Sequence, residues 1–337
     1  MRKFFIGAAV TIHDFRTDPA PATMKADVAI VGAGAAGITL ALSLSRRGYS
    51  VCLLESGGDD PDPDTQSLYD MEYAGYAHRE GYYPRIRMLG GSTSIWAGRS
   101  MTLQGVDLDG TIANRDLSWP IPLSEIDRFL NSAGEYLELP ELHNLEIQPH
   151  QASLTLAEKT ILGVNGLAPA ISLWAVKPQR FGKKFRREID AAPTLQLWTY
   201  ANVTRIVTDD SDRHIKAVQI SSLQGRVGRV EAAQFVLACG GIETPRLLLN
   251  TPGPHRKGLG NSSDHVGRYF MDHPRTVFGR AVLNPEVTLN LSRGLPISHG
   301  KIQLGFRASD KAIRAEGLLN HYCTFEEETS GYVQQTY

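Results

Sequence analysis

The sequence predicts an α/β protein with a doubly wound, mostly parallel sheet, and two features near its start carry that prediction. Residues 28–31 form a short apolar run rich in β-branched residues, typical of a central parallel strand. A glycine-rich turn at 32–37 and a helical pattern follow at once, and a second apolar run at 51–54 ends on Glu55. A strand, a crossover helix and a second strand make a βαβ unit, the seed of a Rossmann-like sheet.

The rest of the chain shows a mixture of helical and strand patterns. We expect a helix within residues 119–139, where apolar residues recur at helical spacing, and another at 242–249 with Pro245 in its first turn. After residue 276 we expect short strands and turns but no helix. Further strands are expected at 195–200, 203–207, 215–220 and 235–238.

The charge balance excludes some classes of partner. The chain has 35 Lys and Arg against 36 Asp and Glu, so its net charge is −1. A protein that binds nucleic acid or an anionic membrane surface normally has an excess of basic residues. We therefore expect neither partner, and a small molecule is the expected ligand.

Cysteine content and apolar runs bear on location. Cys52, Cys239 and Cys323 are odd in number and far apart, which argues against a disulfide framework and favours a reducing compartment. Residues 28–45 are long enough to span a bilayer, but their three glycines divide them into a strand, a turn and a helix. We expect a cytoplasmic protein without a membrane span. Residues 4–12 follow two basic residues and leave export open.

The chemistry lies in the Gly-x-Gly-x-x-Gly turn. Gly32 permits the tight turn, Gly34 lets backbone N–H groups approach a pyrophosphate, and Gly37 lets the helix pack closely on the strand. Glu55 lies 18 residues beyond the last glycine (55 − 37), where a carboxylate can accept both hydroxyls of an adenine ribose. The pattern predicts a dinucleotide site but does not choose between NAD and FAD.

Several segments together resemble the glucose-methanol-choline (GMC) oxidoreductases. They are 27–32, the Glu-Ser-Gly sequence at 55–57, the Arg-x-Arg-x-Leu-Gly-Gly-Ser sequence within 85–98, Trp-Pro-Ile at 119–121, 236–248, and the Asp-His-Pro segment within 266–274. The similarity runs from about residue 25 to 275, in the family's order. It implies an oxidoreductase and flavoprotein that uses FAD to oxidise a CH–OH group of an alcohol or a sugar.

The resemblance also assigns roles within the FAD site. Gly32, Gly34 and Gly37 would hold the pyrophosphate. Glu55 would bind the adenosine ribose and Val203 would meet the adenine through its backbone. Some relatives attach FAD to a histidine where this chain has Ile95, so noncovalent FAD is expected. The full set assigned to the cofactor is Gly32, Ala33, Gly34, Ala35, Ala36, Gly37, Glu55, Ser56, Arg87, Gly90, Gly91, Ser92, Ser94, Trp96, Ala97, Gly98, Val203, Ala238 and Gly240.

For three groups of residues in that set, the resemblance also implies which part of FAD they would lie beside. The small residues from Gly90 to Ser94 would lie along the flavin, and Trp96, Ala97 and Gly98 would lie near the isoalloxazine. Ala238 and Gly240 would border the adenosine.

No catalytic base is predicted. In the resembled family a histidine, with a second His or Asn, lies in a C-terminal segment that finds no match before Tyr337. We therefore expect an N-terminal portion of a longer protein, a fragment that expresses poorly or binds FAD weakly alone. His273, in the Asp-His-Pro segment, is expected to be structural. No metal site is predicted, because there is no His-Glu-x-x-His or similar spacing.

The resemblance suggests a division into domains. An FAD-binding domain would comprise 25–118 and 195–275, a helical excursion or cap 119–194, and part of an α+β substrate-binding domain 276–337. The electron acceptor and any partner chain stay open. The alternatives are a non-catalytic flavin- or nucleotide-binding module that needs a partner chain, and an NAD-dependent dehydrogenase, against which the segments at 90–94 and 238–245 argue.

Overall fold

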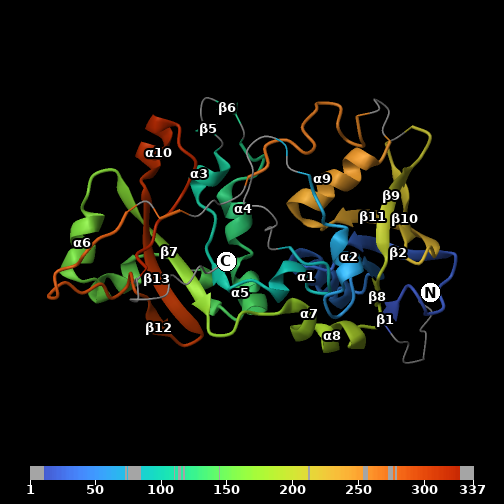
Figure 1. Cartoon of the computed structure of the whole chain (residues 1–337), viewed down its shortest axis with the longest axis horizontal. Helices are drawn as coiled ribbons and strands as arrows, with labels where there is room; N and C mark the ends of the chain where they lie inside the picture. The colour runs from blue at the N-terminus through green and yellow to red at the C-terminus, as the bar shows by residue number, and fades with distance from the viewer. Residues whose placement is uncertain are drawn as a thin grey trace. The chain divides into compact units, whose positions relative to one another are not determined.

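The chain forms two compact units (Figure 1). The computed structural model describes residues 11–72, 74, 85–109, 111–112, 115–116, 118–143, 145–211, 213–252, 257–271, 276–277 and 279–326. The first unit comprises Met1–Trp96 and Arg180–Arg275, and the second comprises Ala97–Gln179 and Thr276–Tyr337. Each unit therefore takes two stretches of sequence, and each is described below by itself.

The first unit is built on a seven-stranded sheet in the order β1-β8-β3-β2-β11-β10-β9. Neighbouring strands from β1 to β11 pair in parallel, and β10 pairs antiparallel with both β11 and β9. Helix α1 connects β2 to β3, which confirms the predicted βαβ unit and the Rossmann-like fold. The strands are β1 (Ile12–Asp14), β2 (Thr23–Val31), β3 (Val51–Leu54), β8 (Leu195–Thr199), β9 (Asn202–Thr208), β10 (Ile215–Ser221) and β11 (Val227–Leu237).

Two central strands are longer than predicted. β2 and β11 pair in parallel from Thr23 opposite Arg229 to Val31 opposite Leu237. The sequence predicted only their carboxyl ends, because only there is the run continuously apolar. Toward their amino ends polar and apolar residues alternate, as in strands that are buried on one face.

The helices of the first unit are α1 (Ala35–Arg46), α2 (Pro63–Ser67), α7 (Phe181–Lys184), α8 (Arg186–Ala191) and α9 (Gly240–Asn250), with a 3-10 turn at Gly91–Ser94. Helix α9 begins two residues earlier than predicted. Pro245 therefore lies inside the helix rather than in its first turn, at the cost of one backbone hydrogen bond.

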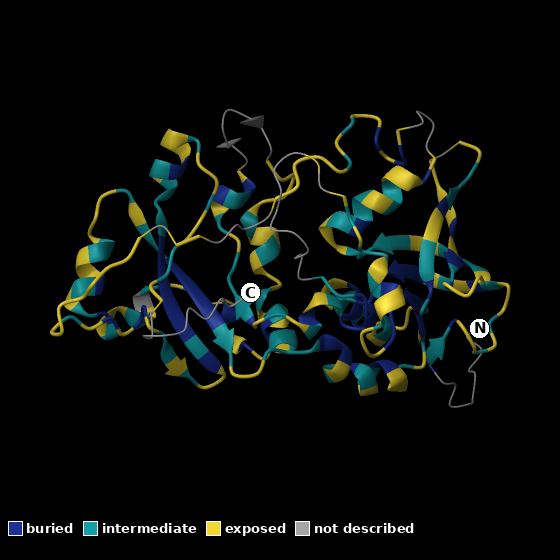
Figure 2. Cartoon of the chain, viewed as in Figure 1, coloured by how far each residue is buried: buried dark blue, intermediate teal, exposed yellow. Residues whose placement is uncertain are grey.

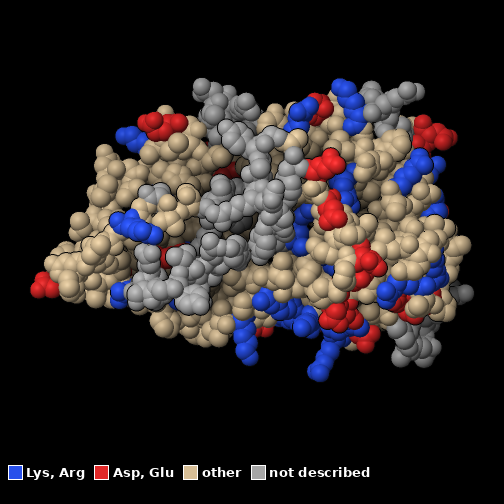
Figure 3. All heavy atoms as spheres, viewed as in Figure 1, with Lys and Arg blue, Asp and Glu red and all other residues tan. Residues whose placement is uncertain are grey.

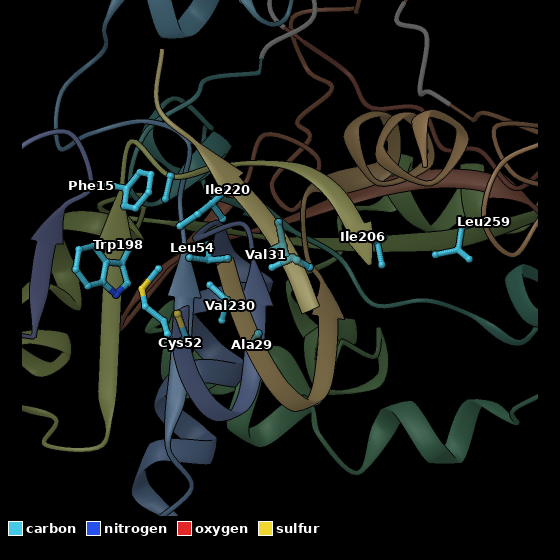
Figure 4. Packing of buried hydrophobic residues seen from close by; sticks show 13 residues of the cluster. Phe15, Ala29, Val31, Cys52, Leu54, Trp198, Ile206, Ile220, Val230 and Leu259 are labelled. Carbon is cyan, nitrogen blue, oxygen red and sulfur yellow. The ribbon is translucent and has the colours of Figure 1, made fainter. Parts of the chain in front are cut away.

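Alternate residues of the central strands supply cores on opposite faces of the sheet. Val31 and Leu54 belong to a buried cluster with Trp198, Ile206 and Leu259, and Figure 4 shows Trp198 and Leu259 at opposite ends of it. On the other face, Ile30 and Leu53 are fully buried, as are Ile38 and Leu42 of α1. Because α1 contacts β2, β3 and β8, this helix covers that face.

The second unit contains a four-stranded antiparallel sheet in the order β12-β13-β7-β4, together with a two-stranded β5-β6 pair. Its strands are β4 (Arg99–Ser100), β5 (Thr111–Ile112), β6 (Arg115–Asp116), β7 (Leu167–Ala175), β12 (Leu295–Ile297) and β13 (Gly300–Ala308). Its helices are α3 (Gly105–Leu108), α4 (Leu123–Asp127), α5 (Leu130–Leu137), α6 (Leu156–Leu162) and α10 (Asp310–Glu316), with 3-10 turns at Pro140–His143 and Gln148–Ser153. Helix α10 was not predicted, although Ser309 caps it.

The core of the second unit explains why the chain divides where it does. β7 pairs with β4 on one side and with β13 on the other, so a strand from 99–100, one from 167–175 and one from 300–308 form a single sheet. Leu139 and Leu173 meet Leu304 in one buried cluster, and Figure 2 shows β7 and β13 largely buried. The division at 96/97 and 179/180 therefore differs from the expected 118/119 and 194/195, and the expected helical excursion shares this core with residues after 276.

The surface of the first unit carries charges of both signs. On the face drawn in Figure 3, basic and acidic side chains are interspersed over the first unit. Within the described residues, no helix combines the length and apolar character needed to cross a bilayer.

Candidate cofactor site

The Gly32–Gly37 turn joins β2 to α1 and is closed on two sides by the chain itself. Gly32 has φ +99°, and a Cβ on it would lie 2.6 Å from the carbonyl oxygen of Ala238. A Cβ on Gly37 would lie 1.8 Å from the carbonyl oxygen of Gly32. Only glycine fits either place. At Gly34, by contrast, no atom of the described residues lies within 4 Å of an added Cβ, so this part of the structure leaves the middle of the turn open.

The amino end of α1 has no side-chain cap for its backbone N–H groups. Gly34 is its N-cap, no side chain accepts from the first-turn N–H groups, and no acidic residue lies in that turn. Ala35 and Ala36 are exposed there, whereas Ala33 is buried. Uncapped N–H groups and the helix dipole make such an end favourable for an anion.

A second helix begins in the same manner. α9 starts after Cys239 with no side-chain cap, Gly240 has φ +81°, and the space beside Gly240 and Gly241 is open. Ala238, immediately before this start, donates its N–H to the carbonyl oxygen of Val31 at 2.7 Å. The contacts of Ala238 with Val31 and Gly32 place the start of α9 next to the glycine turn of α1.

The glycine pair at 90 and 91 also lies against this turn. Gly90 donates its N–H to the carbonyl oxygen of Ala33 at 2.8 Å, and a Cβ on Gly91 would lie 3.1 Å from the Cα of Gly34. Thr93, which the sequence analysis did not single out, fixes this segment: its hydroxyl donates to the Gly90 carbonyl at 2.6 Å and accepts from the N–H of Phe181 at 3.1 Å. The structure thus brings together three glycine-bearing segments that are far apart in sequence.

Glu55 is built into the turn. It is 6% exposed, and its two carboxylate oxygens accept the N–H groups of Ala33 at 2.9 Å and Gly57 at 3.0 Å. Burial raises the pKa of Glu55, while those two hydrogen bonds and the charge of Arg87 act in the opposite direction. Glu55 therefore shapes the turn, a role additional to the ribose contact expected from sequence.

Arg87 connects this region to a residue that the sequence analysis missed. Its guanidinium donates to Ser56 Oγ at 2.8 Å and to Glu243 Oε2 at 2.5 Å, and it lies 4.2 Å from the centre of the Tyr69 ring. The signal available in the sequence was an acidic residue in the first turn of the helix that follows Gly240 and Gly241. By itself, that position resembles an ordinary helix-dipole contact.

The remaining expected residues fall into three groups. Ser92 is exposed and Ser94 partly buried in the 3-10 turn, while the carbonyl of Trp96 accepts from Arg180 at 2.7 Å. Val203 lies in β9, which two strands separate from β2 in the sheet order, and it packs on the core. Ala97 and Gly98 belong to the second unit.

Two further expectations concern metals and histidine. Within the described ranges, no group of three or more His, Cys, Asp or Glu residues could hold a metal ion. The Asp-His-Pro residues, His273 among them, lie outside the described residues.

These features are those of a Rossmann-like α/β protein. Residues 30–87 match the family model described as an NAD(P)-binding Rossmann-like domain, and residues 185–275 match the model described as GMC oxidoreductase. Among curated relatives, the chain is 26% identical to the fructose dehydrogenase large subunit of Gluconobacter japonicus, over 75% of this chain and 59% of that protein. It is 25% identical to the 5-(hydroxymethyl)furfural oxidase of Methylovorus sp. (strain MP688), over 84% and 63%.

The chain is therefore similar to GMC oxidoreductases, as its motifs indicated, and it spans little more than half the length of most of the curated relatives it matches. Among solved structures, pyridoxine 4-oxidase from Mesorbium loti is 22% identical, with a TM-score of 0.45 over 68% of this chain and 52% of that one.

Proposed function

We propose that this chain forms the FAD-binding part of an oxidoreductase that acts on a CH–OH group of an alcohol or a sugar. The observation that carries the proposal is the meeting of two uncapped helix starts with the Gly90–Gly91 turn around open space at Gly34. The relation to GMC oxidoreductases makes FAD, rather than NAD, the dinucleotide that belongs there.

The residues present suit the cofactor. Uncapped N–H groups at Gly34–Gly37 and Gly240–Gly241 would hold the pyrophosphate, because they supply donors without a competing acid at the turn of α1. Glu55, with Ser56 and Arg87 beside it, would bind the adenosine ribose. The glycines at 90 and 91 would let the flavin approach the backbone. When bound, FAD supplies the acceptor for the hydride that leaves the carbinol carbon.

We also propose that the second unit contributes the substrate side. Its antiparallel sheet and helices would correspond to the expected substrate-binding domain, now with 97–179 as well as 276–337. No described residue is assigned as the base that takes the hydroxyl proton. The flavin is proposed to be noncovalent, since Ile95 offers no side chain for a bond to it.

An absorbance spectrum of the purified, desalted chain tests the proposal. Flavin bands that are released into the supernatant by acid are expected, which would establish both the cofactor and its noncovalent binding. Protein that stays colourless after desalting and also shows no binding in a flavin fluorescence titration with FAD would contradict the proposal.

A matched pair of variants tests the location. In Gly34→Val the Cβ meets no atom within 4 Å in the part of the chain that the structure describes, and Gly34 has φ −80°, which valine tolerates. We expect a folded protein whose FAD affinity is reduced at least about a hundredfold, because the branched side chain would displace the pyrophosphate from the N–H groups. Gly105→Val, at an equally open position in the second unit, should bind FAD as the unaltered chain does.

A further inference from the structure

Glu243 is the centre of an ion-pair cluster beside the candidate cofactor site. Glu243 and Arg87 are buried in it, Arg85 is partly buried and Arg246 is exposed. Its Oε1 accepts from Arg85 at 2.8 Å, and its Oε2 accepts from Arg87 at 2.5 Å and lies 2.7 Å from a guanidinium nitrogen of Arg246. The Glu243 and Arg87 side chains are each 9% exposed. Tyr69 lies against both Arg85 and Arg87, at 4.0 and 4.2 Å from its ring centre. One carboxylate therefore holds three guanidinium groups.

Burying charged side chains in such a cluster carries a free-energy cost. Taking charges out of water costs free energy, and an apolar cluster of similar volume often stabilises a fold equally well. The Nε of Arg87 is also buried without a hydrogen-bond partner among the described residues, which adds to the cost. We therefore attribute the buried pair of Glu243 and Arg87 to the segments that it holds in place, rather than to a gain in the stability of the fold.

The cluster is linked to the glycine turn by hydrogen bonds and by close packing. Arg87, held by Glu243, donates to Ser56, and the backbone of 57 packs so closely on Arg87 that a Cβ on Gly57 would lie 2.2 Å from the Arg87 carbonyl oxygen. Gly57 in turn donates to Glu55, which accepts from Ala33 inside the turn.

Two backbone hydrogen bonds connect the residues that follow Arg87, including the Gly90–Gly91 pair, to the same region. Leu89 donates its N–H to the carbonyl oxygen of Gly58 at 2.8 Å, and Gly90 donates to Ala33 at 2.8 Å. Glu243 itself lies in the first turn of α9, just after Gly240 and Gly241. All three glycine-bearing segments of the candidate site are therefore tied to Glu243 within a few bonds.

We propose that Glu243 is a positioning residue for the cofactor: by clamping Arg87, it sets the relative placement of the Gly32–Gly37 turn, the Gly90–Gly91 turn and the start of α9, and thereby the affinity for FAD. This inference rests on the proposed function, since it assumes that FAD binds at these turns. Glu243 does not touch the cofactor in this account; Ser56, Arg87 and the backbone do.

The test compares two buried glutamates. Glu158 is fully buried in the second unit, where it caps α6 with Thr155 and accepts the N–H of Ser292 at 2.7 Å. Glu158→Gln and Glu243→Gln both remove a buried, hydrogen-bonded carboxylate from the full chain, and only the second lies at the candidate site. Flavin fluorescence titration gives the FAD dissociation constant, and circular dichroism gives the folded fraction.

We expect Glu243→Gln to raise the FAD dissociation constant about tenfold or more, since charge-assisted hydrogen bonds hold the three segments together. Glu158→Gln should leave it within about twofold, because independent distant sites do not couple. Equal FAD affinity in folded Glu243→Gln and in the unaltered chain would overturn the inference. An equal loss in both variants would also overturn it, because the effect would then be one of general stability.

Arg87→Lys covers the case in which Glu243→Gln does not fold. It keeps the charge but loses the fork that joins Ser56 to Glu243, so a severalfold weaker affinity is expected while the fold persists. Unchanged affinity in this variant would overturn the inference. An unaltered chain that binds no FAD would overturn the proposed function, and the inference with it.

Discussion

Helices α1 and α9 of the first unit begin differently from helices α6 and α10 of the second. The two longest helices of the first unit, α1 and α9, start at Gly34 and Cys239 without a side-chain cap. In the second unit, α6 starts at Thr155, whose hydroxyl accepts the N–H of Glu158 at 3.2 Å, and α10 starts at Ser309, which accepts from Ala312 at 3.3 Å. Caps of this kind contribute about 1 kcal/mol each. The first unit forgoes them where its glycines leave open space, as expected if a ligand satisfies those N–H groups.

The largest effect is expected at Gly37, where the backbone leaves no room for a side chain. A methyl group at Gly37 would lie 1.8 Å from the carbonyl oxygen of Gly32, so Gly37→Ala must separate α1 from the turn. We expect a loss of about 3 kcal/mol or more in the free energy of unfolding, which most single changes do not reach. Urea unfolding followed by circular dichroism measures it.

The control for this prediction is Gly241→Ala, at the uncapped start of α9. Among the described residues, no atom lies within 4 Å of its added Cβ, and its φ is not positive, so stability should change little. Equal stability of the two variants would show that the close packing at Gly37 is not required.

An intermediate effect is expected at Glu55. Burial raises the pKa of Glu55 above its ordinary value, so there is a pH range in which the folded chain keeps the Glu55 proton and the unfolded chain has lost it. Ionisation of Glu55 therefore lowers the free energy of unfolding as pH rises from 4.5 through the folded-state pKa. Glu55→Gln should remove this slope, and it should also cost about 1–3 kcal/mol, because an amide cannot accept both backbone N–H groups.

Unfolding of the FAD-free chain and of this variant between pH 4 and pH 8 provides the measurement. The control is Glu231→Gln on β11, whose side chain is 39% exposed. If Glu55→Gln shows the same dependence on pH as the unaltered chain, the buried carboxylate is not the group that titrates.

The smallest effect is expected at a cap of the second unit. Thr155→Ala removes the acceptor for the Glu158 N–H and should cost about 1 kcal/mol of stability. FAD affinity should not change, because α6 lies in the other unit. Thr160→Ala, an exposed position in the same helix, should stay within about 0.5 kcal/mol of the unaltered chain. A cap variant that lost FAD affinity would contradict the contrast between the units.

Local patterns were sufficient for the βαβ unit and its glycine turn. The turn needs Gly32 because of its φ and Gly37 because of its packing, and both demands are met within a few residues. Strand ends were harder to predict: β2 and β11 continue well beyond their apolar runs because each supplies the other's hydrogen bonds. Helix α10 was missed although its Ser309 cap and Gly317, with φ +63°, are both visible in the sequence.

By itself, the sequence predicted the Rossmann-like core, the similarity to GMC oxidoreductases and the glycine turn between β2 and α1, because these depend on short motifs with local physical reasons. Tertiary structure decided the division into units, since β4, β7 and β13 meet only through long-range pairing. It also decided that Glu55 braces the turn and that Glu243 holds Arg85, Arg87 and Arg246. Glu243 and Arg85 are separated by 158 residues in the sequence. No local pattern shows which of the charged residues will form ion pairs once the chain has folded.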